Sequence, residues 1–495
     1  MMIKEIIYEK LKAAFIDGLD SLTKFLDKQK QDKYSFFSID SHKNFPVLRN
    51  AELNVYPTFY VGDSAKSDYS SVFSNWRYSE KAEKPESWQD YKSYILSNEE
   101  LCRYFKIGEF YPIDRKEGGR DFWEDFMFDA FVGDLIDAYI HKHSKEFNES
   151  FFLEMFNLYY NSISSKKLIV DVLIPIILVD FTVVDFHINE NISLIHMPNS
   201  LQISRNIRLS SNRTSHPDVA GAATHAFLFK NISFDNADCD SIYNTLSDIE
   251  FYKNTLVEVD YLFACLRSVS KVETGYCQIV ARPLGWQSNF KADLEETFVA
   301  SDRKYPSHFE NNAWYKAYSL VDEKKCEDIR LLYSGLRGDA GKGLANFDLS
   351  IQRLNKACLN SPDDDAIIDA AIALESLLIS SDAHGEINYK LSTRVSLLHK
   401  FYPFSGFSPE GLAALCKKIY AFRSVIVHGN AKKLDSLRIV GIDGNDELTV
   451  VVAIRLLEHI IQVRVLNKQF AKAEDIDKLI FQLELPSLLT GASDK

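Results

Sequence analysis

Residues 166–186 read KKLIVDVLIPIILVDFTVVDF and predict β-strands in a chain that is otherwise rich in helical patterns. The run is rich in β-branched residues, and Pro175 interrupts it, so it favours short buried strands over one long helix. Alternating apolar residues continue in residues 187–197 (HINENISLIHM) and 225–234 (HAFLFKNISF). Together these segments predict a sheet in the middle of the chain.

Helical patterns lie on both sides of these strands. The chain opens with MMIKEIIYEKLKAAF, in which charged and apolar residues alternate at helical spacing, and residues 121–161 also have a largely helical pattern. Residues 240–269 predict a further helical segment, and residues 275–284 (GYCQIVARPL) predict a further strand. We therefore expect a mixed α/β region over residues 1–340, built as one subdomain or as two.

The glycine-rich stretch SGLRGDAGKG, at residues 334–343, marks the expected end of this region. Its four glycines disfavour a helix or a strand, because glycine loses more conformational freedom on folding than any other residue. The stretch also invites comparison with a phosphate-binding loop. It has Leu336 where that motif needs glycine, however, and Gly343 where it needs serine or threonine. We interpret the stretch as a linker.

The remainder of the chain has helical patterns throughout. Ser361 and Pro362 precede three aspartates, which is a strong helix start because serine caps and acids face the positive end of the helix. The predicted helices cover residues 361–378, 388–399, 409–428 and 447–470. Their short connections predict a bundle over residues 344–472, and the charged tail at residues 473–495 either docks as a short final helix or frays. The expected fold class is α+β, with a mixed N-terminal region and an all-α C-terminal bundle.

The composition limits the classes of partner. A net charge of −13 over 495 residues excludes a surface that binds nucleic acid everywhere and leaves only a local basic patch. The seven cysteines are dispersed without a CxxC pair, as is typical of free thiols in a reducing cytosol. The two most apolar stretches, residues 168–186 and 448–466, both contain charged residues and do not predict membrane spans. We expect a cytoplasmic protein with no membrane partner.

Arg423 and His428 are the best candidates for a catalytic pair, within RSVIVHGN at the end of a predicted helix. Arginine is permanently cationic and suits a phosphate, and histidine exchanges a proton near neutral pH. Five residues along a helix separate two side chains by about 140°, so one straight helix does not direct both at the same atom. Either the helix loosens at Gly429, or a second copy of the chain completes the site across a two-fold axis.

Further residues are candidates for supporting roles. Glu375 shares a helical side with apolar residues, so we expect it to be partly buried and paired with Arg423 or Arg394. It either orients Arg423 or forms a structural ion pair within the bundle. Ser424 and Asn430 are the other supporting residues. Four lysines form the local basic patch that RNA would need: Lys417, Lys418, Lys432 and Lys433.

Residues 344–466 resemble the HEPN superfamily, and most closely its Apea-like branch. The matching segments occur in the family's order: LSIQRLNKACL, DDDAIIDAAIALESLL, INYKLSTRVSLL and KKIYAFRSVIVHGNAKK. The resemblance covers about a quarter of the chain, and RSVIVH corresponds to the R-x(4–6)-H ribonuclease signature of that superfamily.

The resemblance implies a helical bundle that dimerises, so that paired motifs line a shared cleft and cleave RNA without a metal, leaving a cyclic phosphate. Arg423 and His428 would then be the catalytic pair, and Glu375 matches a carboxylate often found on the helix that faces the motif. Many catalytic members have Asn, Asp or His directly after the arginine, whereas this chain has Ser424. Many members are toxins or antiviral effectors, and the Apea-like branch is linked to phage defence.

We therefore expect a metal-independent endoribonuclease that needs no cofactor and acts as a homodimer on RNA, with transfer RNA among the candidate substrates. Residues 1–340 would sense a trigger, such as a phage-derived one, or restrain the nuclease. The alternative is a non-catalytic bundle that binds RNA or dimerises within a regulatory protein. His141 and His143 do not predict a metal site, because they would point to nearly opposite faces of a helix, and we expect both to be solvated.

Overall fold

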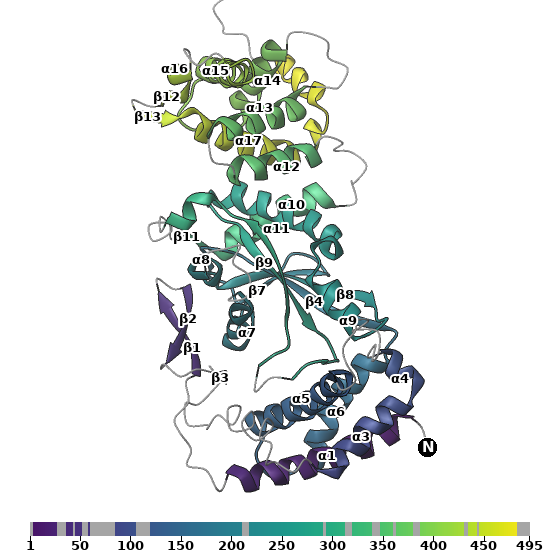
Figure 1. Cartoon of the computed structure of the whole chain (residues 1–495). Coiled ribbons are helices and arrows are strands. Elements are labelled where there is room, and N and C mark those ends of the chain that lie inside the picture. The colour runs from purple at the N-terminus through teal and green to yellow at the C-terminus, as the bar shows by residue number, and fades with distance from the viewer. Residues whose placement is uncertain are drawn as a thin grey trace, which may run out of the picture. The chain divides into compact units, whose positions relative to one another are not determined.

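The computed structural model of the chain divides into two compact units, and Figure 1 labels the helices and strands of both. Unit 1 comprises Met1–Lys253 and Tyr276–Arg303, and unit 2 comprises Asn254–Gly275 and Lys304–Lys495. The chain thus enters unit 2 once, returns to unit 1, and enters unit 2 again. The residues that the structure describes are 3–26, 36–42, 45–51, 58–59, 85–104, 119–209, 217–290, 294–311, 319–338, 347–359, 363–379, 387–429, 434–442 and 445–482.

The first helices of unit 1 share an aromatic core. Their buried residues include Phe15, Tyr91 and Phe156, and the indole N–H of Trp88 donates to the Ala14 carbonyl at 2.7 Å. A buried indole with a satisfied N–H contributes a large apolar area without leaving a polar group unpaired. These helices are α1 (Ile3–Leu26), α3 (Glu86–Ser97), α4 (Glu99–Tyr104), α5 (Gly119–Lys142) and α6 (Glu149–Ser164).

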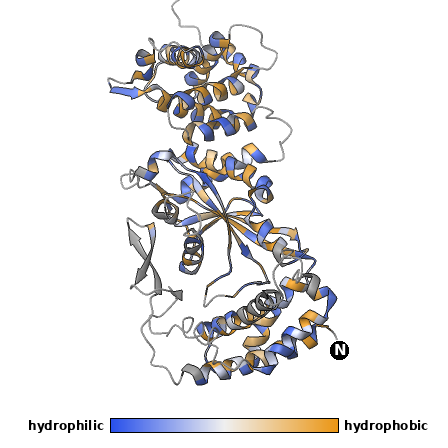
Figure 2. Ribbon diagram, in the orientation of Figure 1, coloured by the Kyte–Doolittle hydropathy of each residue, from blue (hydrophilic) through white to orange (hydrophobic). Residues whose placement is uncertain are grey.

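A six-stranded sheet forms the second part of unit 1, in the order β10-β9-β4-β8-β7-β6. Its strands are β4 (Lys167–Pro175), β6 (Asp185–His187), β7 (Ile192–His196), β8 (His225–Asp235), β9 (Tyr276–Pro283) and β10 (Phe298–Lys304). Strand β4 pairs antiparallel with both β8 and β9, and β7 pairs antiparallel with β6 and β8. The apolar run at residues 166–186 therefore supplies a central strand, and Figure 2 shows how hydrophobic this part of the sheet is.

The chain reverses after β4 and reaches β5 (Val179–Phe181) through Leu178, whose φ of 61° is unusual for a large side chain. Helix α7 packs on the sheet, where Leu201 joins a buried cluster with Leu173 and Val280. The other elements of unit 1 are β1 (Phe36–His42), β2 (Phe45–Ala51), β3 (Thr58–Phe59), α7 (Asn199–Leu209), α8 (Pro217–Gly221), α9 (Cys239–Ser247) and the 3-10 helix Ile249–Tyr252.

Unit 2 is a helical bundle in which α13 packs against α12, α14, α15 and α17 (Figure 1). Its longer helices are α10 (Lys253–Ser270), α11 (Glu323–Arg337), α12 (Phe347–Leu359), α13 (Asp363–Leu378), α14 (Ile387–Phe401), α15 (Pro409–Val427) and α17 (Thr449–Leu466). Its short elements are β11 (Ser319–Val321), α16 (Leu434–Arg438), β12 (Ile439–Ile442), β13 (Asn445–Leu448) and the 3-10 helices Ser307–Asn311, Lys468–Phe470 and Ala473–Gln482.

The division between the units does not coincide with the predicted boundary at residues 334–343. Helix α11 includes the first four residues of that stretch, because Gly335 packs against Val465 of α17. Tyr333 and Arg337 of α11 both bind Glu258 of α10. These contacts make α10 and α11 part of the bundle unit, although both precede the glycine-rich stretch in the sequence.

The α+β fold class is confirmed, as is the helical character of the C-terminal region. The bundle also contains a β12–β13 hairpin that the prediction did not include. Part of the predicted tail docks: in the 3-10 helix Ala473–Gln482, Asp477 forms a bidentate pair with Arg394 of α14. The predicted cap formed by Ser361 and Pro362 lies outside the described residues. None of the described helices is long and apolar enough to cross a bilayer.

Candidate functional site

Helix α15 carries the Arg423/His428 pair and has a well-defined start and end. The Ser408 side chain caps it by accepting the N–H of Gly411 at 3.1 Å, and Pro409 occupies the first turn. His428 is the C-terminal cap, and Gly429 follows in the left-handed conformation with φ of 71°. The helix buries one apolar stripe against the bundle: Leu412, Leu415, Cys416, Ile419 and Phe422.

Glu375 fixes the position of Arg423. This carboxylate comes from α13, is only partly buried, and accepts a hydrogen bond from Arg423 Nη1 at 3.1 Å. Burial raises the pKa of Glu375, and the neighbouring Arg423 offsets part of that rise. The prediction that Glu375 pairs with Arg423 or Arg394 is thus resolved in favour of Arg423, because Arg394 binds Asp477 instead.

The other edge of the Arg423 guanidinium has no partner among the described residues. Arg423 Nε is buried without a hydrogen bond, and the guanidinium bonds to Glu375 through Nη1. In Arg394, Nε and Nη2 donate to the two carboxylate oxygens of Asp477 at 2.8 and 2.7 Å. Arg337 and Arg330 bind carboxylates through the same pair of nitrogens. Because Nε itself is buried, an anion such as a phosphate would have to approach the part of the Arg423 side chain that stays exposed, which is 31% of it.

His428 is exposed at the end of α15, and its side chain makes no hydrogen bond within the described part of the chain. Because the residues before it are helical, its side chain leaves the helix axis about 140° away from that of Arg423. One chain therefore does not bring the two side chains together. The helix ends at Val427 with His428 as its cap, and it does not loosen before His428, whose N–H still bonds to the Ser424 carbonyl.

The remaining predicted site residues differ in their surroundings. Ser424 is half-buried on α15, and its carbonyl accepts the N–H of His428 at 3.0 Å. Lys417 is exposed, whereas the ammonium of Lys418 donates to the Ile439 carbonyl in β12, so this lysine is engaged with the hairpin. Three predicted residues lie outside the described part of the chain: Asn430, Lys432 and Lys433.

Tyr420 is a neighbour of Arg423 that was not predicted from the sequence. The ring centroid of Tyr420 lies 5.8 Å from the Arg423 guanidinium carbon, within cation–π range. Tyr420 is half-buried and one turn before the arginine. Its position three residues before Arg423 is the signal that could have identified it.

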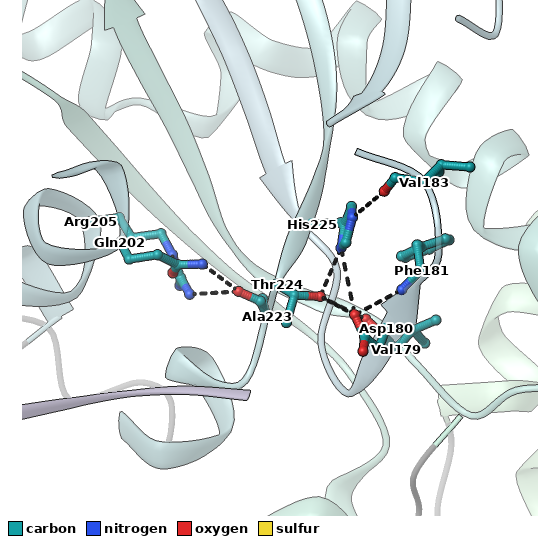
Figure 3. Close-up of polar contacts among 9 residues, drawn as sticks. All are labelled: Val179, Asp180, Phe181, Val183, Gln202, Arg205, Ala223, Thr224 and His225. Carbon is teal, nitrogen blue, oxygen red and sulfur yellow. Dashed lines mark hydrogen bonds and ion pairs between the residues drawn. The ribbon is translucent and has the colours of Figure 1, made fainter. Parts of the chain in front are cut away.

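A second polar cluster lies in unit 1, where Thr224 and His225 lead into β8 (Figure 3). His225 Nε2 lies 2.7 Å from the Val183 carbonyl oxygen, so this nitrogen carries the proton and donates it. The Nδ1 atom of the neutral ring then accepts the Thr224 hydroxyl at 2.8 Å, and Asp180 Oδ1 lies 3.2 Å from the same hydroxyl. Burial lowers the pKa of His225 and so favours the neutral ring.

This cluster links β5, which carries Asp180, to the start of β8, and it is not an accessible reaction centre. Thr224 and His225 are both buried, and Gln202 and Arg205 extend the hydrogen bonding to the Ala223 carbonyl (Figure 3). Sequence reasoning did not select these residues. The signal was a histidine at the first position of an otherwise apolar strand, a position where a buried ring needs partners on both nitrogens.

The prediction for His141 is wrong, because this side chain is buried. Its Nδ1 atom lies 2.8 Å from the Asp137 carbonyl and 3.2 Å from the Asp137 carboxylate. His143 is exposed, as predicted. Among the described residues, no group of three or more His, Cys, Asp or Glu side chains is arranged to hold a metal ion.

Comparisons with known proteins give no indication of the function of the chain. No family model matches the chain, and neither a curated protein nor a solved structure matches it. Any function must therefore be argued from the residues of α13 and α15.

Proposed function

We propose that the chain is an endoribonuclease of the HEPN type, which cleaves RNA through attack by a 2′-hydroxyl group and needs no metal. The observation that carries the proposal is the state of Arg423. Glu375 holds its guanidinium through Nη1, and its Nε donor is buried without a partner among the described residues. The Arg423 side chain is nevertheless 31% exposed, so an anionic ligand could reach the guanidinium from solvent while Glu375 holds it.

The reaction needs one base and one acid, and histidine supplies either. A neutral imidazole takes the proton from the ribose 2′-hydroxyl, and the oxygen forms a new bond to phosphorus. The bond from phosphorus to the 5′-oxygen breaks, and an imidazolium gives its proton to that leaving oxygen. Arg423 stabilises the added negative charge on the phosphorane. The products are a 2′,3′-cyclic phosphate and a 5′-hydroxyl.

A single chain has one His428, which diverges from Arg423 by about 140°. Two copies related by a two-fold axis would supply both histidines and would let an arginine from one copy face a histidine from the other. We therefore propose a homodimer whose site is shared. The exposed position of His428 is compatible with such a site.

We further propose that the nuclease acts as an antiphage or toxin-like effector in the cytoplasm, and that unit 1 senses a trigger or restrains the bundle. This part of the proposal rests on the resemblance of residues 344–466 to the Apea-like branch. RNA is the proposed substrate class, with transfer RNA among the candidates.

The direct test compares the purified wild type with His428→Ala and Arg423→Ala on total RNA in the presence of EDTA. We expect wild-type fragments that end in 2′,3′-cyclic phosphates and a rate loss of at least about 10²-fold in either variant, since each removes a proton-transfer or charge-stabilising group. Lys356→Ala, on α12, is the matched control for loss of a charge in the bundle. Equal cleavage by all four proteins would refute the proposal.

The second candidate function is a non-catalytic module that binds RNA or dimerises. Ser424 favours it, because many catalytic members of the superfamily have Asn, Asp or His at that position. This alternative predicts RNA retention that weakens as salt rises, without cyclic-phosphate products. The EDTA assay and a salt titration of binding on the same samples therefore separate the two.

A further inference from the structure

The solvent-facing side of α15 presents a defined set of residues between Arg423 and His428. At 100° per residue, Val427, Tyr420 and Ser424 fall within the arc of about 140° that separates the two motif residues. Val427 is 61% exposed, and Tyr420 and Ser424 are half-buried. Over the last two turns of α15 the arc is therefore an accessible strip, whereas Cys416, about 20° from Arg423 and nearly two turns earlier, belongs to the buried stripe.

Lys417 extends the strip toward the start of α15. It is exposed and falls at an angle of about 60° from Tyr420, on the His428 side of the arc. From Lys417 to His428 the helix rises by roughly 16 Å. A strand of RNA that follows the strip would meet Lys417 at one end and His428 at the other, with the aromatic ring of Tyr420 between them.

Tyr420 is positioned to act on a base while Arg423 acts on a phosphate. Its ring centroid is 5.8 Å from the Arg423 guanidinium carbon, so the two groups are immediate neighbours on one helix face. Proteins that bind single strands combine such cations for the backbone with aromatic rings on which unpaired bases stack. A base inside a duplex is already stacked and cannot use the ring.

We infer that Tyr420 is a base-stacking residue that makes the site select an unpaired nucleotide next to the bound phosphate. The inference rests on the proposed function, because it assumes that Arg423 binds an RNA phosphate. It adds a specificity-determining residue that lies outside the R-x(4–6)-H motif.

The test uses the full-length chain with His428→Ala, so that binding is measured without cleavage. A fluorescent single-stranded RNA oligonucleotide and its duplex are titrated by anisotropy against this background and against added Tyr420→Leu or Tyr420→Phe. Leucine retains apolar volume for packing, and phenylalanine retains the ring. Tyr389→Leu, at an exposed tyrosine of α14, is the matched control.

We expect Tyr420→Leu to weaken single-strand binding by about tenfold, while Tyr420→Phe and the Tyr389 control bind as the background does. Duplex binding should be unchanged in all of them. Equal single-strand affinity of Tyr420→Leu and the background, with an unchanged melting temperature, would overturn the inference. So would an equal loss in Tyr420→Phe, since the ring is then not what matters.

Cleavage by chains with intact His428 separates this inference from the proposed function. If the wild type fails to cleave but the Tyr420 effect on binding is present, the proposed function falls and the base-stacking role stands. If the wild type cleaves, and Tyr420→Leu cuts the same positions at the same rate, the base-stacking role falls and the proposed function stands.

Discussion

Arginine residues in this chain differ in how their five N–H donors are used. Arg205 is fully buried and has no carboxylate partner. All of its side-chain nitrogens nevertheless donate to oxygens, which are backbone carbonyls and the side-chain amide oxygens of Gln202 and Gln278. Burial lowers the pKa of Arg205 to about 10. Arg423, by contrast, leaves Nε without a partner among the described residues. Arg205 therefore supports the fold alone, whereas the Arg423 side chain is 31% exposed and keeps donors that a ligand could use.

His225 should make the stability of the protein depend on pH in a defined direction. Its pKa in the folded chain is lowered by burial, so between the ordinary histidine pKa of about 6.5 and the folded value the unfolded chain binds more protons. Its contribution to the free energy of unfolding is therefore complete above about pH 7 and is lost as the pH falls below 6.5.

Urea denaturation at pH 7.5 and 5.5 checks this, with His225→Gln as the comparison. Glutamine does not titrate and keeps an N–H that can reach the Val183 carbonyl. We expect the wild type to lose more stability than the variant on acidification, because other titrating groups are common to both. A difference between the two proteins that stays constant with pH would contradict the role of His225.

At the scale of elements, close packing decides where α11 belongs. Gly335 lies in the last turn of α11, and glycine within a helix is unfavourable by roughly 0.5–1 kcal/mol relative to alanine. A β-carbon at this position would come within 2.5 Å of Val465 Cγ1. The glycine therefore permits α11 and α17 to approach closely, and packing overrides helix propensity.

Gly335→Ala should destabilise the bundle in spite of the better helix propensity of alanine. We expect a loss of about 1–3 kcal/mol from overpacking, because the branched Val465 side chain is rotationally restricted and cannot move aside cheaply. Thermal denaturation followed by circular dichroism measures it. Gly441→Ala in β12, where no atom lies within 4 Å of the added carbon, should be close to neutral. Adding Val465→Ala should recover part of the Gly335→Ala loss.

For the whole molecule, the connectivity of the units explains why a boundary search along the sequence fails. Helix α10 lies between two segments of unit 1, and it joins the bundle through Arg267, which bonds to Asn355 of α12. Asn355 also donates to the Asp260 carbonyl at 2.8 Å. A composition change marks a boundary only when each unit is one continuous segment, and here neither unit is.

A site shared by two chains makes a prediction that a site on one chain does not. Wild type and His428→Ala are co-expressed with different tags, and the mixed dimer is isolated by two affinity steps. With a shared site, the mixed dimer lacks one of the two proton-transfer groups, and we expect far less than half of the wild-type activity. Half activity would indicate independent sites. Recovery of no mixed species would count against dimerisation.

The sequence alone predicted the strand within residues 166–186, the helices of the C-terminal region and the start and end of α15, but neither the β12–β13 hairpin nor the helical state of residues 334–337. Serine caps, positive-φ glycine and apolar periodicity act between residues a few positions apart, so their effects can be predicted from local sequence. The chemistry at Arg423 and His428 could also be proposed at this level, including their divergence by about 140° around the helix.

Only the tertiary structure decided which partner each group meets. Glu375 had two candidate arginines, and the docking of Asp477 on Arg394 leaves Arg423 to it. The burial of His141 and the membership of α11 in the bundle were likewise not predicted. All three depend on contacts between segments far apart in the chain or on packing from several elements at once. Such contacts depend on how side chains pack against one another in three dimensions, so they cannot be predicted from the spacing of residues along the chain.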